Sequence, residues 1–113
     1  MTNQEYFIDV GILTTIMFAH HSCSNEDYLH NVELREDYFL NNFHKTIVRQ
    51  INHNKLNSVP IFNELIEINL IENRTMDYGL WHTIINANPF GKTLFDAYYE
   101  KIKEPKTSLY YEV

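Results

Sequence analysis

The sequence contains little of what several protein classes depend on. Its single cysteine, Cys23, excludes an intramolecular disulfide framework. Glycine and proline number three each, too few for a collagen-like or linker-like chain. No apolar run approaches the roughly 20 residues of a membrane span, and no basic and apolar leader opens the chain. These absences favour a cytoplasmic protein that makes no contact with a membrane.

An excess of positive charge is also missing. The 113 residues carry a formal net charge of −6, and the lysines and arginines are scattered from Arg35 to Lys106. A module that binds DNA by itself is normally basic, because phosphate neutralisation supplies much of its affinity. The charge therefore predicts no direct contact with nucleic acid.

Helical periodicity dominates what is present. Hydrophobic residues make up 44% of the chain, as in an ordinary folded domain, and they recur at three- and four-residue steps. Helices are predicted over about residues 4–20, 25–31, 37–52 and 93–104. Two more are expected between these, one opened by Ser58-Val59-Pro60 and one capped by Thr75 or Asp77 and stopped at Asn88–Gly91.

The predicted architecture is an all-α, compact bundle of five to six helices, with residues 1–104 as a helical interaction domain. Residues 105–113 are expected to form a short tail, extended or disordered, because Pro105 ends the last helix. An apolar stripe marks the first helix, although Gly11 interrupts it. The inward-facing residues expected for the first, fourth, fifth and last helices are Ile8, Ile12, Thr15, Ile16 and Ala19, widened by Leu13 and Met17; Phe62, Leu65, Ile66, Asn69 and Leu70; Leu80, Trp81, Ile84 and Ile85; and Leu94, Phe95, Tyr98 and Ile102.

Two further expectations concern the surface of the fourth helix and the end of the third. Ile61, Ile68 and Ile71 broaden the apolar surface of the fourth helix and suggest that it is covered on two sides. The turn-formers at Asn52–Asn54 are expected to end the third helix.

Histidine and cysteine raise the question of a metal site. His20, His21 and Cys23 are the densest group, but no second pair with matching spacing accompanies them. The favoured interpretation is a solvated helix terminus, and no metal ligand is predicted. A small metal-binding protein that also uses His82 stays an alternative.

Catalytic motifs are weak. No strained glycine-rich turn surrounds Cys23, and neither a phosphate-binding loop nor a dinucleotide fingerprint occurs. Gly91-Lys92-Thr93 resembles the end of a phosphate-binding loop but lacks the preceding glycine, so it is interpreted as a cap and turn. The sequence predicts no catalytic residue, no cofactor and no enzyme.

Aromatic residues reach 14% and include several tyrosines near the carboxyl end. Tyrosine is enriched where proteins contact partners. The adjacent pair Tyr98 and Tyr99 must project to different faces, so one of them should reach the surface. These two and Tyr110 and Tyr111 form the predicted partner surface.

Three stretches, taken together, resemble the amino-terminal domain of bacterial replicative helicases of the DnaB type. The first is like the opening helix of that domain, the second like its acid-Phe turn and following His-basic pair, and the third like the end of its globular part. The matching residues are Asp9–Met17; Arg35–Phe39 with Phe43–Ile47; and Asn88–Pro89 with Phe95–Glu104. Coverage is about residues 5–104.

The resemblance implies a non-catalytic α-helical domain that forms part of the helicase collar, is able to form dimers, and takes part in primase binding. It implies that His44 faces inward, that Phe39 and Ile47 are core, and that Glu36 and Asp37 cap the third helix. The expected partners are therefore helicase, primase or a second copy.

The carboxyl end departs from the family. Pro105 and a tyrosine-rich end stand where a long dimerising hairpin, and then an ATP-driven motor, would follow. This favours a stand-alone protein, such as a loader, regulator or inhibitor of helicase from a mobile element or phage. The helicase-binding end of primase, which has a related globular fold, is a second relative.

Overall fold

The computed structural model describes residues 3–21, 27–56 and 61–104, and this part of the chain is all-helical, as predicted. None of its helices is long and apolar enough to cross a membrane. Its elements are α1 (Asn3–His21), α2 (Asp27–His30), the 3-10 helix η1 (Glu36–Tyr38), α3 (Asn42–Lys55), α4 (Phe62–Glu72), α5 (Tyr78–Ile85) and α6 (Lys92–Ile102).

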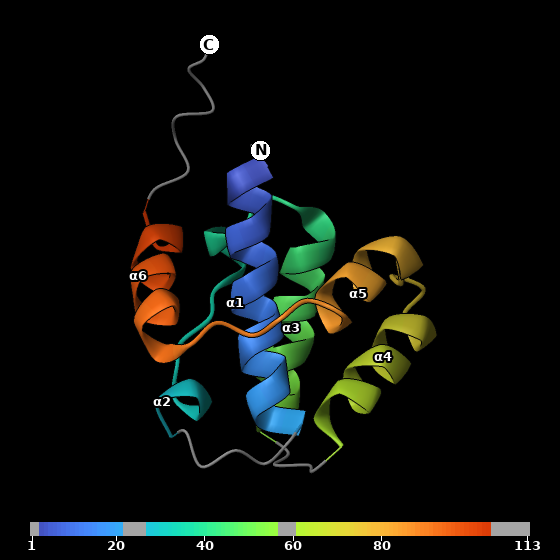
Figure 1. The fold of residues 1–113 in the computed structure, drawn as a ribbon. Coiled ribbons are helices and arrows are strands. Elements are labelled where there is room, and N and C mark those ends of the chain that lie inside the picture. Colours follow the sequence, from blue (N-terminus) through green and yellow to red (C-terminus); the bar gives the residue numbers. More distant parts are fainter. Residues whose placement is uncertain (1–2, 22–26, 57–60, 105–113) are drawn as a thin grey trace.

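Helix α1 is the centre of the fold. The other five α-helices contact it, and Figure 1 shows it standing between α6 on one side and α4 with α5 on the other. Every residue from Ile8 to Met17 is buried, and so is Ala19. The predicted single stripe on this helix is therefore too narrow. A small bundle closes around one apolar helix, which is covered on all its sides between Ile8 and Met17.

Helix α3 begins later than the sequence predicts, because the residues expected to cap it belong to a separate short helix. Glu36 and Asp37 lie in the separate helix η1 and form ion pairs with arginines. The cap is Asn41, whose Oδ1 accepts hydrogen bonds from the backbone N–H groups of Phe43 and His44 at 2.8 and 3.1 Å. An asparagine side chain in this position satisfies amides that have no partner inside the helix.

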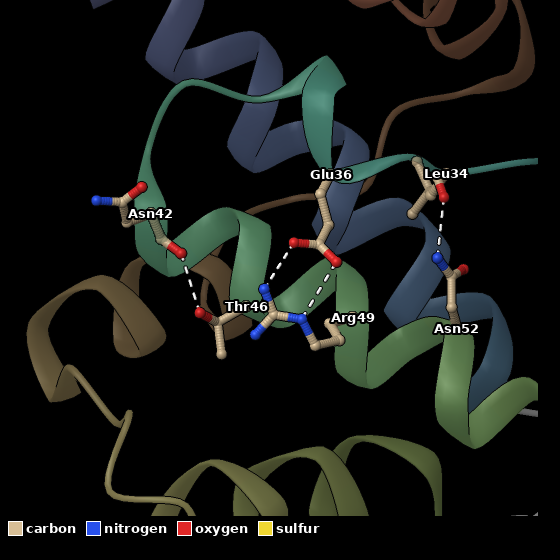
Figure 2. Close-up of polar contacts among 6 residues, drawn as sticks. All are labelled: Leu34, Glu36, Asn42, Thr46, Arg49 and Asn52. Atoms are coloured by element: carbon tan, nitrogen blue, oxygen red, sulfur yellow. Dashed lines mark hydrogen bonds and ion pairs between the residues drawn. The ribbon is translucent and has the colours of Figure 1, made fainter.

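The Asn41→Ala variant is expected to lower the free energy of unfolding by about 1 kcal/mol, because both amides lose their acceptor. Asn42→Ala is the matched control. Its side chain is exposed, and only its backbone carbonyl is used, by the Thr46 hydroxyl at 3.0 Å (Figure 2), so a change within about 0.5 kcal/mol is expected. Chemical denaturation of both variants provides the comparison. Equal losses would show that Asn41 does not act as the cap.

The extended segment before η1, together with Glu36 at the start of η1, runs antiparallel to α3 and binds it. Its partners on α3 recur every three residues and so share one helix face, while its own contacting residues recur every two, as on one side of an extended chain. Arg49 pairs with the Glu36 carboxylate at 2.7 and 3.1 Å, and Asn52 donates to the Leu34 carbonyl at 2.9 Å, as Figure 2 shows. The Lys55 ammonium donates to the Val32 carbonyl at 2.7 Å. The prediction that Asn52–Asn54 ends the helix is wrong, since α3 continues to Lys55 and these contacts use its last turns.

The segment between α5 and α6 crosses α1, as Figure 1 shows. The Thr14 hydroxyl donates to the Ile84 carbonyl at 2.6 Å, and the Phe90 N–H donates to Thr15 Oγ1 at 2.7 Å. The Thr15 hydroxyl donates in turn to the Gly11 carbonyl at 2.6 Å. The Phe90 ring lies directly against Gly11, where an added Cβ would overlap it. Gly11 therefore allows this segment to approach α1 closely.

The apolar faces of the outer helices are narrower than predicted. Helix α4 packs on α1 and α3 through one face, so the prediction of a helix covered on two sides is wrong. Buried positions match the prediction at Phe62, Ile66, Leu70, Trp81, Ile84, Phe95 and Ile102. Exposed large apolar residues on or beside these helices are Ile61, Ile68, Ile71, Tyr78, Ile85 and Leu94.

Candidate interaction surfaces

Tyr98 belongs to an aromatic cluster formed by α6, α1 and the segment before α6. Its ring centroid lies 5.0 Å from that of Phe90 and 6.5 Å from that of Phe7, and the two phenylalanines are 5.6 Å apart. Tyr98 is half-buried, but Phe7 is 56% exposed and Leu94, one turn before Tyr98, is 51% exposed. This aromatic cluster is one apolar surface on which a partner could pack.

Tyr99 serves the fold. Its hydroxyl donates to the Glu33 carbonyl at 2.5 Å, its ring stacks on Phe95 with centroids 5.8 Å apart, and the Lys103 ammonium lies 4.7 Å from its centroid. Burial raises the pKa of its phenol. Of the adjacent tyrosines, Tyr98 is thus the one beside exposed apolar side chains. Tyr110 and Tyr111 lie outside the described residues.

His20, near the end of α1, packs among other aromatic rings. His20 stacks on Phe62 with centroids 4.4 Å apart and meets His30 edge-on at 4.5 Å. Burial first, and then repulsion from His30 and Lys55, lower the pKa of His20 to about 4. His20 is therefore held as a neutral ring among other rings, which corrects the solvated terminus expected for it.

Residues 3–21, 27–56 and 61–104 contain no group of three histidine, cysteine or acidic side chains that could hold a metal. His21 is exposed and lines a hollow between α1, α4 and α5, and His82 is exposed on α5. Cys23 lies outside the described residues. The described geometry thus gives the metal-site alternative no ligand set.

His44 is buried completely, at 0% exposure, beside the core residues Phe39 and Ile47, as expected. Its ring centroid lies 5.6 Å from that of Tyr6 and 6.3 Å from that of Phe39. Neither ring nitrogen has a hydrogen-bond partner within the described part of the chain. Burial lowers the pKa of His44 to about 4, because an imidazolium there would lose its hydration without gaining a partner.

The outer face of α4 carries isoleucines between glutamates. Ile61, Ile68 and Ile71 are 53%, 47% and 47% exposed, and Glu64 and Glu72 are exposed beside them. Helix α4 contains no lysine or arginine. We call this set of five residues the α4 outer face.

A hollow of about 70 Å³ lies between α1, α4 and α5. Most of its lining is apolar, and Phe18 and Ile85 in it are 56% and 42% exposed. The side-chain oxygen of Asn63 is buried there and has no hydrogen-bond partner among the described residues. The lining residues are Thr14, Met17, Phe18, His21, Asn63, Ile84, Ile85 and Ala87.

Sequence reasoning missed both the α4 outer face and the hollow. It assigned the isoleucines of α4 to a second covered side, because apolar residues occur on every side of that helix. A signal was present in the glutamates, since Glu64 and Glu72 share the side of the helix on which Ile61 and Ile68 lie. A side that mixes isoleucine with glutamate is seldom core, because unpaired carboxylates are rarely buried.

Comparisons of the chain with protein family models, with curated proteins and with solved structures found no match. The resemblance to the helicase domain accordingly rests on the three sequence stretches. Any assignment of function depends on those stretches and on the chemistry of the described surface.

Proposed function

We propose that this chain is a non-catalytic protein–protein interaction domain of the DNA replication machinery, which docks on the replicative helicase, the primase or both. The observation that carries the proposal is the order and spacing of the three stretches within residues 5–104 that resemble the DnaB-type amino-terminal domain. The proposal puts the domain in the cytoplasm. A homodimer, and a stand-alone loader, regulator or inhibitor of helicase, are forms of the same function.

The surface chemistry supports docking. Nine large apolar side chains of the described residues are 42% or more exposed, and several gather in the aromatic cluster and on the α4 outer face. Contiguous apolar surface of this kind marks interaction sites in small proteins. The net charge of −6 suits a domain that contacts proteins while another module holds the nucleic acid.

The purified chain is expected to bind helicase or primase from the same cell with a micromolar or tighter dissociation constant. Titration calorimetry of the chain into each protein tests this. A short DNA duplex is the negative control, for which no binding is expected. Lack of binding to both proteins at tens of micromolar would contradict the proposal.

A DNA-unwinding assay separates the forms of the proposed function. A loader increases the rate at which helicase starts unwinding, an inhibitor decreases unwinding, and a passive collar component changes neither. Each effect should saturate at the concentration of chain that saturates binding in the titration.

A further inference from the structure

We propose that the α4 outer face and the adjoining hollow form one docking surface for a basic amphipathic helix of a partner protein. The inference deepens the proposed function and rests on it for the partner's identity alone. It stands on exposed apolar side chains, a preformed hollow and a one-sided distribution of charge, all in the described residues.

The apolar part of the surface is a ridge along α4. Ile68 and Ile71 are three residues apart and share one side of the helix, and Ile61 is the residue directly before α4. The buried residues Phe62, Ile66 and Leu70 occupy the opposite side. The ridge is thus an apolar row that the packing of α4 onto α1 and α3 leaves open to solvent.

The hollow continues this ridge toward α5. Asn63, which lines the hollow, is followed at four-residue steps by Glu67 and Ile71, so these three side chains follow one edge of α4. Phe18 and Ile85 supply exposed apolar surface from α1 and α5 at the hollow. One partner helix lying along this edge would reach both the hollow and the ridge.

The size and polarity of the hollow define what enters it. A cavity of about 150 Å³ admits benzene, so a hollow of about 70 Å³ admits only the end of one aliphatic side chain. The side-chain oxygen of Asn63 has no hydrogen-bond partner among the described residues but is closed to solvent, so it accepts from a partner's N–H only when the Asn63 side chain turns into the hollow.

Charge selects the occupant more strongly. Helices α1, α4 and α5 contain no lysine or arginine. Between residues 61 and 86 there are four carboxylates, Glu64, Glu67, Glu72 and Asp77, against the single cation Arg74. Such a field attracts a basic partner and speeds its association.

The same charge argues against other occupants. Nucleic acid and anionic membrane would be repelled. In a two-fold dimer the identical faces would meet, and each would bring its three α4 glutamates against those of its copy. An extended peptide that binds by adding a strand needs a sheet edge, and the described residues contain no sheet. A helix with an apolar stripe and flanking lysines packs on a helical ridge by the ordinary geometry of helix pairs.

The probe for this surface is a fluorescein-labelled amphipathic peptide of about 18 residues built from Leu and Lys, with a Leu and Glu peptide of the same pattern as its counterpart. Fluorescence anisotropy should show the Lys peptide binding the full chain at least roughly tenfold tighter than the Glu peptide. Raising the salt concentration should reduce the difference in affinity between the two peptides.

Two variants and one control localise the binding. The double variant Glu64→Gln with Glu67→Gln should bind the Lys peptide roughly fivefold more weakly than the wild type. The double variant Ile68→Ser with Ile71→Ser should bind it roughly tenfold more weakly, or worse. All four side chains lie outside the core, so the variants should keep the circular dichroism and melting of the wild type. Leu94→Ser with Glu104→Gln makes a similar change on and just after α6 and should leave binding unchanged.

Several results would overturn the proposal. These are equal binding of the two peptides, α4 variants that bind the Lys peptide as the wild type does, an equal loss in the α6 control, and a dimer of the free chain that the α4 variants dissociate. The last would make a second copy the occupant. Failure of helicase and primase to bind would contradict the proposed function but not this surface, because the peptide titration contains neither protein.

Discussion

Replacing Gly11 with Ala is expected to lower the free energy of unfolding by about 2 kcal/mol, although the same change within a helix normally stabilises it by up to about 1 kcal/mol. The new Cβ would overlap three atoms of the Phe90 ring. That ring cannot turn aside freely, because it packs against Phe7 and Tyr98 and its backbone N–H is bound to Thr15. Overpacking of this kind costs about 1–3 kcal/mol, and a displaced ring would also pack less well against its aromatic neighbours.

The Phe90→Ala background should reverse the sign of the effect. Without the ring, the three atoms that the Cβ at position 11 would overlap are gone, and Gly11→Ala should then stabilise the chain by up to about 1 kcal/mol through helix propensity. Gly79→Ala is the control for propensity alone. A Cβ at Gly79 in α5 meets only Asp77 Oδ1 at 3.5 Å, an ordinary contact, so this variant should be neutral or stabilising.

Urea denaturation of the wild type, the single variants and the double variant gives the coupling free energy directly. The close approach of the connecting segment to α1 predicts a coupling of about 3 kcal/mol between positions 11 and 90. Additive effects of the two substitutions would mean that Phe90 does not lie on Gly11 in solution.

The parts of the fold that depend on near neighbours could be predicted from the sequence. Periodicity and capping patterns indicated all the α-helices, and periodicity indicated the burial of Trp81 and Ile84 in α5. Asp77 was an expected cap, and its Oδ1 accepts from the Leu80 N–H at 3.0 Å. Gly91 was interpreted as a cap and is the residue before α6. Such signals act over three or four residues and are visible in the chain itself.

Contacts between distant residues were not predictable in this way. Gly11 looked like a weak point of α1. The structure explains it by the Phe90 ring, 79 positions further along the chain, which occupies the space that a side chain would need. The bonds from Asn52, Lys55 and Tyr99 to carbonyls of the extended segment likewise join separate parts of the chain. No local pattern marks them, because a backbone carbonyl has no side-chain signature.

On the candidate surfaces, residues of one type differ in exposure in ways that their sequence does not indicate. Tyrosine content pointed to Tyr98 and Tyr99, but only the packing shows that one hydroxyl is used inside the fold. Isoleucine on α4 has the same hydropathy on either side of the helix, so hydrophobicity alone does not separate Ile66 in the core from Ile68 at the surface. The arrangement of α1 and α3 around α4 decides between them.

Mild acid is expected to destabilise the wild-type chain by about 2 kcal/mol at pH 5 through His44 alone. The pKa of His44 is lowered by burial to about 4 in the folded chain, against 6.5 for a free histidine. Above pH 6.5 both the folded and the unfolded chain hold a neutral ring, so stability does not change. As the pH falls below 6.5, the unfolded chain binds a proton and the folded chain does not. The free energy of unfolding therefore falls, and the loss reaches about 3 kcal/mol near pH 4.

His44→Leu should remove this loss. Leucine has a similar volume and no polar atoms, and the two nitrogens of His44 have no partner in the described residues, so the variant should be at least as stable as the wild type at pH 7.5. His82→Asn is the matched control, because it removes an exposed histidine from α5 and keeps the buried His44 in place.

The measurement is the free energy of unfolding by urea from pH 7.5 to 5, where carboxylates of ordinary pKa remain charged. His20, whose pKa is also lowered to about 4 mainly by burial, adds a loss of its own that both variants retain. The difference between wild type and His44→Leu isolates His44. Its decline should begin near pH 6.5 and continue to the lowest pH measured, because the folded chain takes up the proton only near pH 4. A constant difference across this range would mean that His44 is solvated or hydrogen-bonded in the folded chain, and that the core between α1 and α3 is more open than its packing indicates.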